Sequence, residues 1–588
     1  MEHKEEKRIC QNCKKDFVIE IEDFNFYEKI KVPPPTFCPE CRLRRRLAFR
    51  NERFLFKIKC AFSGKEIFST ISPDAGAVVY ENAVWFSDKW DPLDYGQDFD
   101  FSRSFFEQLN ELLHKVPLYA QSSIFGVNSE YSSNYTALKN CYLVFNSNYS
   151  ENCAYSTNLT HSRQCIDCSF AGKSENCYEC FWLNSCANCF WSVQCHDSYN
   201  LYFSKSCVGC NDCFGCVNLR NKKYCLFNQP LSKEEYQEFL CKFNSESQEE
   251  VQKWAEEAKK LWSKNPVRFM EGVKNANVSG EYIHNCKNVR DSYMAIDTQD
   301  SRYTSFVEKG PVKDCYDYSV WGNGAELIYE SSSCGLGVSG LRFCYEMWST
   351  ARNAEYSLFC VSSSDIFGCV GLHNKRFCIF NKQYSETEYK KLRQKIIAHM
   401  DDMPYRDKKG NVYTYGEFFP PMLSLYAHNK TMAEEFFPKG KDEALKGGYF
   451  WEDLKEKDYK PTIKGSELAD NNVIIKDNVL KEIILCASWE QDPQKALLKN
   501  CSKAFRIIES ELQFYRRLKI PLPLYCHNCR HHDRNLNRQP MQLWNRKCMC
   551  DKEEHGHKGL CPVEFETSYA PDRPEIVYCE KCYQQEVY

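Results

Sequence analysis

The chain has 588 residues, of which 43% are hydrophobic and 27% charged, and its formal net charge is -3 at pH 7. This composition is ordinary for a folded protein and excludes an overall polycation, so nucleic-acid binding would have to come from local basic patches. At about 150 residues per domain, the length predicts three or four domains.

The N-terminal segment from Met1 to Arg8 is charged and lacks the apolar core of a secretory signal. No stretch approaches the ~18 apolar residues of a membrane span. We therefore expect a cytoplasmic protein without a membrane anchor. In such a reducing compartment, its 36 cysteines are expected as metal ligands and buried thiols, with disulfides as the alternative.

The cysteines near the two ends of the chain share one register. A shift of 488 positions carries Cys13, Cys38, Cys41 and Cys60 onto Cys501, Cys526, Cys529 and Cys548. The same shift pairs aromatic residues and prolines, among them Phe17 with Phe505, Phe26 with Phe514, Tyr27 with Tyr515 and Pro33 with Pro521. One ancestral unit is therefore expected at both ends.

Two CxxC pairs about 25 residues apart are the usual ligand set of a structural zinc ribbon. The N-terminal set is Cys10, Cys13, Cys38 and Cys41. In the C-terminal copy Leu498 stands where Cys10 would, so we expect the upstream Cys486 to join Cys501, Cys526 and Cys529.

A second ribbon follows each first one. At the C-terminus its ligands are predicted to be Cys561, Cys579, Cys582 and either Cys548 or Cys550, with the 488 shift favouring Cys548. His555 and His557 lie in an inserted loop and could replace a thiolate, or could be surface histidines. In the N-terminal copy only Cys60 remains, because Ser63, Glu81 and Val84 occupy the other ligand positions. About three Zn²⁺ sites are therefore expected, all closed by four thiolates and so structural rather than catalytic.

Two related modules lie between the ends. Phe214-Gly215-Cys216-Val217 closes the first and Phe367-Gly368-Cys369-Val370 closes the second, and capping boxes follow at Ser232 with Glu235 and at Ser385 with Glu388. In the first module cysteines recur with a period of 21, as in Cys165, Cys186 and Cys207. Repeats of about 20 residues rich in Cys, Asn and Ser suggest a parallel β-solenoid with small residues inside and Asn stacked at the corners.

The central cysteines have two interpretations. They can be small buried residues in a narrow core. Alternatively, pairs such as Cys165/Cys168, Cys177/Cys180, Cys186/Cys189 and Cys207/Cys210 could bind additional metal.

The predicted fold class is mainly β with helical insertions, in which zinc ribbons at both ends flank two related parallel β-solenoid-like modules. The predicted order is a ribbon pair (1–95), module 1 (120–230), a helical insertion (231–270), module 2 (271–383), a helical or irregular linker (384–480) and a second ribbon pair (481–588).

An arginine stripe follows the second knuckle of each first ribbon. If the segment is helical, Arg42, Arg46 and Arg50 share one face, and Arg530, Arg534 and Arg538 occupy the shifted positions. Such stripes suit contacts with nucleic-acid phosphates, without base readout. The alternative is a solvated helix face paired with acidic neighbours.

Five segments resemble one family: CQNCKKDF from Cys10, FCPECRLRRRLAFRNER from Phe37, SDKWDPL from Ser87, FGCVNLRNK from Phe214 and SYAPDRPEIVYCEKC from Ser568. They are similar to large, uncharacterised cysteine-rich zinc-ribbon proteins of reduced-genome bacteria. The resemblance covers nearly the whole chain and implies no activity. It also implies that Ser63, Glu81 and Val84 depart from positions where other members have zinc ligands.

The sequence contains no Walker loop, GxSxG or HExxH motif. We therefore expect a non-enzymatic zinc-binding scaffold that contacts RNA or DNA backbone through the arginine stripes. The first alternative is a protein-interaction scaffold in which these arginines meet acidic protein. The second is an enzyme with a site on the solenoid surface. The sequence leaves the oligomeric state open.

Overall fold

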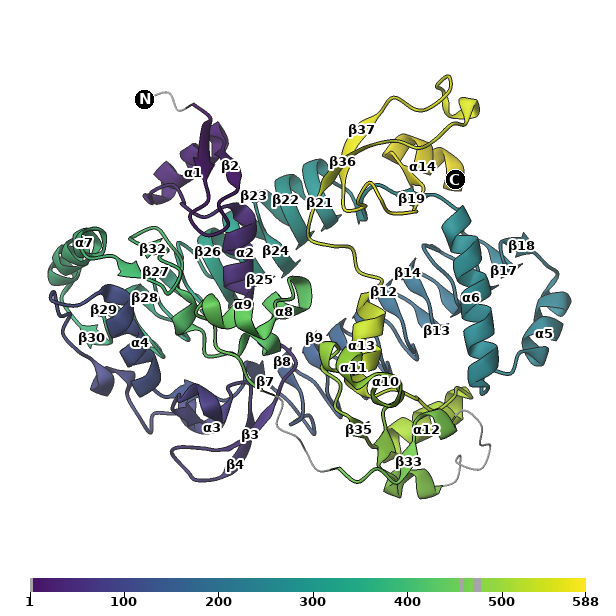
Figure 1. Cartoon of the computed structure of the whole chain (residues 1–588), viewed down its shortest axis with the longest axis horizontal. Helices are drawn as coiled ribbons and strands as arrows, with labels where there is room; N and C mark the ends of the chain where they lie inside the picture. Colours follow the sequence, from purple (N-terminus) through teal and green to yellow (C-terminus); the bar gives the residue numbers. More distant parts are fainter. Residues whose placement is uncertain (1–3, 454–458, 469–476) are drawn as a thin grey trace.

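A computed structural model describes residues 4–453, 459–468 and 477–588. Two modules built from parallel strands make up the centre, and the units from the two chain ends pack around them (Figure 1). Helices lie in the end units, in the segment that separates the modules, and in the segments before module 1 and after module 2. Within the described ranges, no helix combines the length and apolar composition that a membrane crossing requires.

Module 1 consists of short strands that pair in parallel with a constant offset. Thr157 pairs with Ser169, Ser169 with Phe181 and Phe181 with Val193, so neighbouring strands are 12 residues apart in sequence. One of its sheets contains β7 (Ser123–Ile124), β8 (Ser133–Thr136), β9 (Phe145–Asn148), β10 (Thr157–Thr160), β11 (Ser169–Gly172), β12 (Phe181–Asn184) and β14 (Val193–His196). The other contains β13 (Ala187–Phe190), β15 (Tyr199–Tyr202), β16 (Asn211–Phe214), β17 (Lys223–Leu226) and the antiparallel β18 (Gln229–Pro230).

A three-residue backbone unit underlies this offset. Along module 1 about every third residue has a positive φ, for example Asn140, Leu143, Asn146 and Tyr149. Such a conformation is least costly for Gly and, among other residues, for Asn and Asp, which explains why the module is rich in Asn. Four such units make one 12-residue turn of the chain.

Small side chains fill the interior of module 1, as predicted. The hydroxyl of Ser156 accepts a hydrogen bond from the backbone N–H of Cys168, 12 residues later, at 3.0 Å. The thiol of Cys168 in turn donates to the carbonyl oxygen of Ile166 at 3.5 Å. Serine and cysteine therefore serve the same inward position, because each is small and satisfies a buried backbone group.

Asparagine ladders run along the outside of module 1, as predicted. Asn128 donates to Asn140 at 3.0 Å and Asn140 to Asn152 at 3.1 Å, each step again spanning 12 residues. The predicted turn of about 20 residues is wrong. The cysteines of this module are separated from one another by multiples of three residues. The 21-residue period in the sequence is therefore a multiple of the three-residue unit and not the length of a turn.

Module 2 has longer strands and a less regular offset, which explains why its repeat is blurred in the sequence. Ala276 pairs with Lys287 and Val312 with Ala325, whereas Arg352 pairs with Ser364 and Ser364 with Arg376. Its strands are β20 (Gly272–Val273), β21 (Ala276–His284), β22 (Lys287–Ile296), β23 (Thr298–Arg302), β24 (Ser305–Lys309), β25 (Val312–Gly322), β26 (Ala325–Gly335), β27 (Arg352–Glu355), β28 (Ser364–Phe367), β29 (Arg376–Ile379) and the antiparallel β30 (Lys382–Gln383). Strands β22, β23, β25 and β24 pair around a closed ring. The structure thus shows two parallel-strand modules but does not confirm a uniform solenoid.

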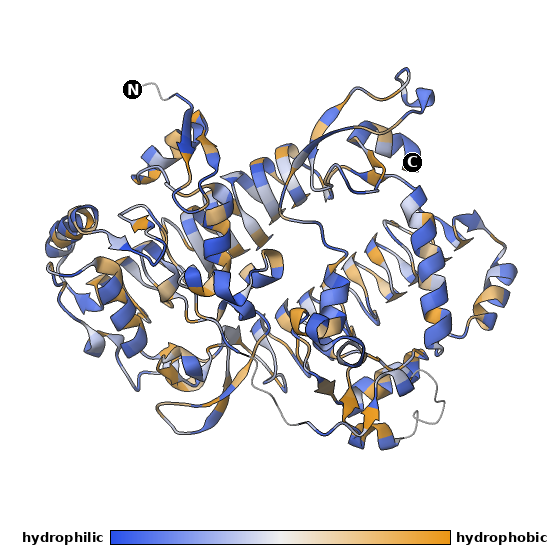
Figure 2. Ribbon diagram, viewed as in Figure 1, coloured by the Kyte–Doolittle hydropathy of each residue, from blue (hydrophilic) through white to orange (hydrophobic). Residues whose placement is uncertain are grey.

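Each module ends in a predicted capping box. Ser232 accepts from the Glu235 N–H and Ser385 from the Glu388 N–H, while both glutamates accept in return from the serine N–H. These caps begin α5 (Lys233–Lys242) and α7 (Glu386–Asp402). The predicted insertion helix is divided into α5 and α6 (Gln248–Lys264), and the visible face of α6 is largely hydrophilic (Figure 2).

The end units repeat the same elements at the predicted shift. Helix α1 (Ile21–Ile30) corresponds to α12 (Glu509–Leu518), and α2 (Pro39–Leu47) to α13 (His527–Asn535), with the same bounds after 488 positions. Strands β3 (Phe56–Lys59), β4 (Glu66–Ser69) and β5 (Val79–Tyr80) correspond to β36 (Trp544–Lys547), β37 (Glu564–Thr567) and β38 (Val577–Tyr578). The duplication inferred from the cysteines is therefore also a duplication of structure.

The other helices and strands complete the end units or connect them to the modules. They are β1 (Glu6–Ile9), β2 (Asp16–Ile19), α3 (Asn82–Trp85), α4 (Phe105–Lys115), β6 (Leu118–Tyr119), β19 (Val267–Arg268), β31 (Tyr405–Arg406), β32 (Val412–Tyr413), α8 (Met432–Phe436), α9 (Lys441–Lys446), β33 (Ile463–Lys464), β34 (Ile484–Leu485), α10 (Ala487–Gln491), α11 (Pro493–Leu498), β35 (Ala504–Phe505) and α14 (Glu580–Val587).

The end units connect the two modules crosswise: in each end unit the first ribbon contacts one module and the second ribbon lies at the start of the other (Figure 1). Helix α2 of the N-terminal unit lies on β25 and β26 of module 2, whereas α13 of the C-terminal unit lies on β11 of module 1. The second ribbons make the opposite connections. Strand β5 pairs with β6, which leads into module 1, and β38 pairs with β19, which leads into module 2. Each end unit therefore contacts both modules.

Candidate metal centres

The first knuckle pair gathers its four predicted cysteines into one group. The sulfur atoms of Cys10, Cys13, Cys38 and Cys41 all lie within 4.8 Å of one another. Cys13 Sγ and Cys38 Sγ are 3.7 Å apart. Four sulfurs about 2.3 Å from a tetrahedral Zn²⁺ would be about 3.8 Å apart, so the thiols fit such an ion without rearrangement.

The C-terminal counterpart uses Cys486, as expected from the missing cysteine at Leu498. Cys486, Cys501, Cys526 and Cys529 form the second group. The Sγ–Sγ distances are 3.8 Å between Cys486 and Cys529 and 3.7 Å between Cys501 and Cys526. The neighbouring thiol of Cys501 helps to lower the pKa of Cys486 to about 7, which favours the thiolate that a metal requires.

The last ribbon brings together Cys548, Cys561, Cys579 and Cys582. Of the two candidates, Cys548 belongs to this group and Cys550 does not, in agreement with the 488 shift. Cys561 Sγ and Cys579 Sγ are 4.0 Å apart. Cys550 is also buried nearby, but it belongs to a separate group with His555 and Cys582. The alternative of a surface histidine is wrong for His555, which is only 4% exposed.

One backbone hydrogen bond recurs at all three groups. The N–H of the cysteine that caps the following helix donates to the first sulfur of the group, from Cys38 to Cys10, from Cys526 to Cys486 and from Cys579 to Cys548. The distances are 3.3, 3.2 and 3.2 Å. Each such bond favours the thiolate and fixes its direction.

The second N-terminal ribbon retains this geometry without the ligands. The N–H of Glu81, which occupies the position of Cys579, donates to Cys60 Sγ at 3.3 Å. The N–H of Ser63, at the position of Cys561, donates to the same sulfur at 3.4 Å. Among the described residues Cys60 belongs to no group of potential metal ligands, as expected from its lost partners.

The central cysteines are buried and form no such group within the described ranges. Their thiols donate instead to backbone carbonyl groups, for example from Cys165 to Arg163 at 3.3 Å and from Cys180 to Tyr178 at 3.3 Å. The structure therefore favours the interpretation of these cysteines as small packing residues.

The N-terminal arginine stripe is directed into the protein. Arg42 lies 2.8 Å from Asp317 Oδ2 through its Nη2, and Arg46 Nη1 lies 2.9 Å from Asp317 Oδ1. Arg46 Nε also donates to the Ser319 hydroxyl at 3.1 Å. Arg42, Arg46 and Asp317 are at most 1% exposed. The knuckle helix is thus attached to β25 of module 2 by one carboxylate shared between two guanidinium groups.

The C-terminal stripe makes the same contact with module 1. Arg530 Nη1 lies 2.6 Å from Asp167 Oδ2, and Arg534 Nη1 lies 2.8 Å from Asp167 Oδ1. Arg534 Nε donates to the Ser169 hydroxyl at 3.4 Å. Both copies therefore use two arginines, one aspartate and a serine two residues after that aspartate.

The last arginine of each stripe also pairs with a carboxylate, although it lies beyond its helix. Arg50 follows the end of α2 at Leu47 and donates to Glu346 at 3.0 Å. Arg538 follows the end of α13 at Asn535 and donates to Glu435 at 2.8 Å. The expectation that all three arginines share one helix face is wrong.

These contacts leave the predicted phosphate binding without support. Arg42, Arg46, Arg50, Arg530 and Arg534 are at most 5% exposed, and every arginine of both stripes pairs with a carboxylate. The alternative is right about the acidic neighbours and wrong about the solvated face, because these arginines are buried against other parts of the chain.

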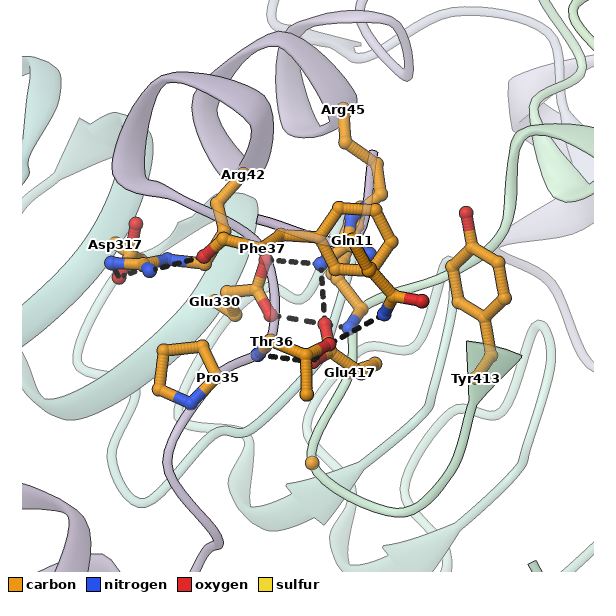
Figure 3. A network of polar contacts seen from close by, with 12 residues as sticks. Gln11, Pro35, Thr36, Phe37, Arg42, Arg45, Asp317, Glu330, Tyr413 and Glu417 are labelled. Carbon is orange, nitrogen blue, oxygen red and sulfur yellow. Dashed lines mark hydrogen bonds and ion pairs between the residues drawn. The ribbon is translucent and has the colours of Figure 1, made fainter. Parts of the chain in front are cut away.

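Arg45 extends the N-terminal network and was missed in the sequence. It donates to Glu330 of β26 at 2.7 Å and to Glu417 at 3.2 Å (Figure 3). Glu417 also accepts from the Thr36 N–H at 2.8 Å, and the Arg45 guanidinium lies 4.2 Å from the ring centre of Phe37. No local motif reveals Arg45, because its partners lie hundreds of residues away.

A cavity of about 180 Å³ lies between the modules. Its lining includes Glu308 and Glu346. Glu346 pairs with Arg50 and accepts from the Tyr119 hydroxyl at 2.8 Å, while Glu308 accepts from the Asn158 amide at 2.5 Å. Burial raises the pKa of Glu308 to about 8. Both carboxylates are thus engaged in contacts between elements of the fold.

Comparisons with known proteins do not place the chain in a family. No family model matches it, and no curated protein matches it significantly. Among solved structures, it matches a "putative acetyltransferase" from Desulfovibrio desulfuricans G20 at 9% identity, over 50% of this chain and 85% of that chain, with a TM-score of 0.10. At that TM-score the match supports no conclusion about fold or function.

Proposed function

We propose that the chain is a non-enzymatic zinc-binding scaffold in which three zinc ribbons hold two β-solenoid-like modules in a crosswise arrangement. The observation that carries the proposal is the repeated contact of a zinc-knuckle helix with a module. Arg42 and Arg46 share Asp317 of module 2, and Arg530 and Arg534 share Asp167 of module 1.

Zinc is the metal that suits these groups. Four thiolates in a tetrahedron favour a soft or borderline ion without redox chemistry, and a closed site leaves no position for substrate. Binding would contribute directly to folding, because the cysteines of each group come from separate segments that the ion would join.

The ion would also position the arginines. Cys38 and Cys41 flank the start of α2, and Arg42 follows directly, so a metal at the first group fixes the helix end from which the arginines project. The same relation holds for Cys526, Cys529 and Arg530 at α13. Loss of zinc is therefore expected to release the arginine–aspartate contact with the module.

Hydrogen exchange on the full chain tests this proposal. Removal of zinc by a chelator, or the variant Cys38→Ser, should increase amide exchange in α2 and in the facing strands β25 and β26. The variant Cys526→Ser should have the same effect on α13 and β11. Cys168→Ser serves as the matched control, because Cys168 is a buried thiol in the interior of module 1 that donates to the Ile166 carbonyl group and belongs to none of the three four-cysteine groups.

Unchanged exchange in α2 and β25 after verified loss of zinc would contradict the proposal. As for partners, the internal pairing of the arginine stripes removes the basis for contacts of these arginines with nucleic-acid phosphates and equally with an acidic protein. The raised pKa of Glu308 is the one feature of the cavity that resembles an enzyme site, and its engagement with Asn158 supports a structural role instead.

A further inference from the structure

The last ribbon contains two potential ligands that its N-terminal counterpart lacks. The shift between the copies rises from 488 at Cys548 to 498 at Cys561, so about ten residues are inserted between them. Cys550 lies at the start of this insertion, and His555 lies within it. The residue that matches Cys550 in the N-terminal copy is Phe62, which is 47% exposed, whereas Cys550 is fully buried.

Cys550 and His555 contact each other through their ligand atoms. Cys550 Sγ lies 3.2 Å from His555 Nδ1. The other ring nitrogen, Nε2, lies 3.8 Å from the Glu586 carboxylate. That carboxylate accepts from Lys552 Nζ at 2.6 Å and lies beyond hydrogen-bond distance of the imidazole, so the contact between Cys550 Sγ and His555 Nδ1 is the observation that joins the two as ligands.

Cys582 belongs to two ligand groups at once. Its sulfur is within 4.8 Å of those of Cys548, Cys561 and Cys579, and also within 4.8 Å of Cys550 Sγ and the His555 ring nitrogen. All of these side chains are at most 5% exposed, and Cys582 is 1% exposed. A thiolate in this position can bridge two metal ions.

A second histidine approaches the same sulfur from the inserted loop. His557 Nε2 lies 3.6 Å from Cys582 Sγ, and His557 Nδ1 lies 2.8 Å from the Gly559 carbonyl oxygen. Because the carbonyl oxygen can only accept, Nδ1 carries the proton and the lone pair of Nε2 points toward Cys582. Nitrogen and sulfur ligands of one tetrahedral Zn²⁺ are about 3.6 Å apart.

We propose that the last ribbon binds two zinc ions rather than one. The first is held by Cys548, Cys561, Cys579 and Cys582, and the second by Cys550, His555 and Cys582, with Cys582 bridging and His557, 3.6 Å from the Cys582 sulfur, as a candidate fourth ligand. The second Zn²⁺ brings more positive charge than the single added thiolate of Cys550 offsets. The second ion therefore reduces the net negative charge of the buried four-thiolate centre. This lowers the free-energy cost of burying that charge.

Zinc content of the full-length protein tests this inference, which rests on the proposed three-ribbon scaffold. Native mass spectrometry of protein saturated with Zn²⁺ should show four zinc ions per chain. Cys550→Ser and His555→Ala should each lower that number by one. Cys241→Ser, at an exposed thiol, and His161→Ala, at an exposed imidazole, should leave it at four.

A Co²⁺-substituted protein tests the bridge without any variant. Two Co²⁺ ions joined by Cys582 should couple magnetically, so the electron paramagnetic resonance signal per cobalt should be lower in the wild-type chain than in Cys550→Ser. Equal signals per cobalt would overturn the bridging assignment.

Failure of this inference is distinguishable from failure of the scaffold. Three zinc ions in the wild-type chain, unchanged in Cys550→Ser and His555→Ala, would overturn the two-zinc centre and leave the three ribbons intact. Fewer than two zinc ions per chain would overturn both the two-zinc centre and the three-ribbon scaffold.

Discussion

Arg46 of the N-terminal knuckle helix and Asp317 of module 2 form a fully buried ion pair, with Nη1 and Oδ1 2.9 Å apart. Arg42 contacts the other oxygen of the same carboxylate. Removal of one partner of a buried ion pair leaves an uncompensated charge, which costs more than the intact pair contributes.

Asp317→Asn should therefore lower the free energy of unfolding by about 3–5 kcal/mol, the usual cost of breaking a buried pair. Denaturant unfolding measures this change. Asp314→Asn on the same strand is the matched control, because Asp314 pairs with Lys29, whose side chain is half exposed, and such pairs contribute about 0–1 kcal/mol. A loss at Asp317 no larger than at Asp314 would contradict the role assigned to the arginine contact.

Asp167→Asn should reproduce the effect at the other end of the chain, because Arg530 and Arg534 share this carboxylate in the same way. Exchange protection should fall in α13 and β11 and remain unchanged in α2 and β25. A loss of exchange protection spread evenly over both modules would contradict the separate attachment of α2 to module 2 and of α13 to module 1.

The lost N-terminal zinc site should be recoverable. The triple variant Ser63→Cys, Glu81→Cys, Val84→Cys restores the ligand types around Cys60, whose sulfur already accepts from the N–H groups of residues 63 and 81. We expect one additional zinc ion per chain by mass spectrometry. The double variant with Ser63→Cys and Val84→Cys is the control and should gain little, since it offers three thiolates. No gain in the triple variant would show that the backbone there no longer fits the metal.

Central cysteines should be replaceable without loss of metal. Cys168→Ser keeps a small side chain that can donate to the Ile166 carbonyl group, and serine already fills equivalent inward positions such as Ser156. Zinc content should therefore be unchanged, with a loss of stability of about 1 kcal/mol for the altered buried contact. A lower zinc content would assign metal to the central cysteines.

Attachment of the last ribbon to module 2 should weaken as the pH rises from about 4.5 to about 8. Glu281 of β21 is buried against Ser568, and burial raises its pKa to about 8. Because the folded pKa is above the value near 4.5 of a free glutamate, the folded state binds the proton more tightly. The stability this proton contributes is complete below about pH 4.5 and is lost as the pH rises to about 8.

The thermal midpoint of the wild-type chain, compared with Glu281→Gln across this range, measures the effect. The glutamine variant mimics the protonated group, so the difference between the two should grow as the pH rises toward 8. A constant difference would contradict the raised pKa.

The sequence predicts the end units better than the modules. CxxC spacing is a local constraint of tetrahedral zinc, so Cys10, Cys13, Cys38 and Cys41 could be grouped without knowledge of the fold, and the 488 shift carried this grouping to the other end. Cys486 followed from the gap at Leu498.

The turn length of module 1 was predicted wrongly for a physical reason. The inward position recurs every three residues and accepts Ser, Cys or Ala alike, so the cysteines sample only part of the true pattern. Had Ser156 and Ser174 been counted with Cys168 and Cys186, the 12-residue spacing would have been visible.

The arginine stripes show why charge alone is a weak guide. The spacing placed Arg42 with Arg46 and Arg530 with Arg534 on one helix face, but the partner carboxylates Asp317 and Asp167 lie far away in the sequence. A signal existed in the common spacing of Asp317 to Ser319 and Asp167 to Ser169. Only the fold shows that these acids face the arginines.

The zinc content of the natively purified chain tests the central claim most directly. Inductively coupled plasma mass spectrometry should find three zinc ions in the terminal four-cysteine groups and a fourth at Cys550 and His555. Cys38→Ser and Cys526→Ser should each lose one. Fewer than two zinc ions per chain, with the protein folded, would contradict the account.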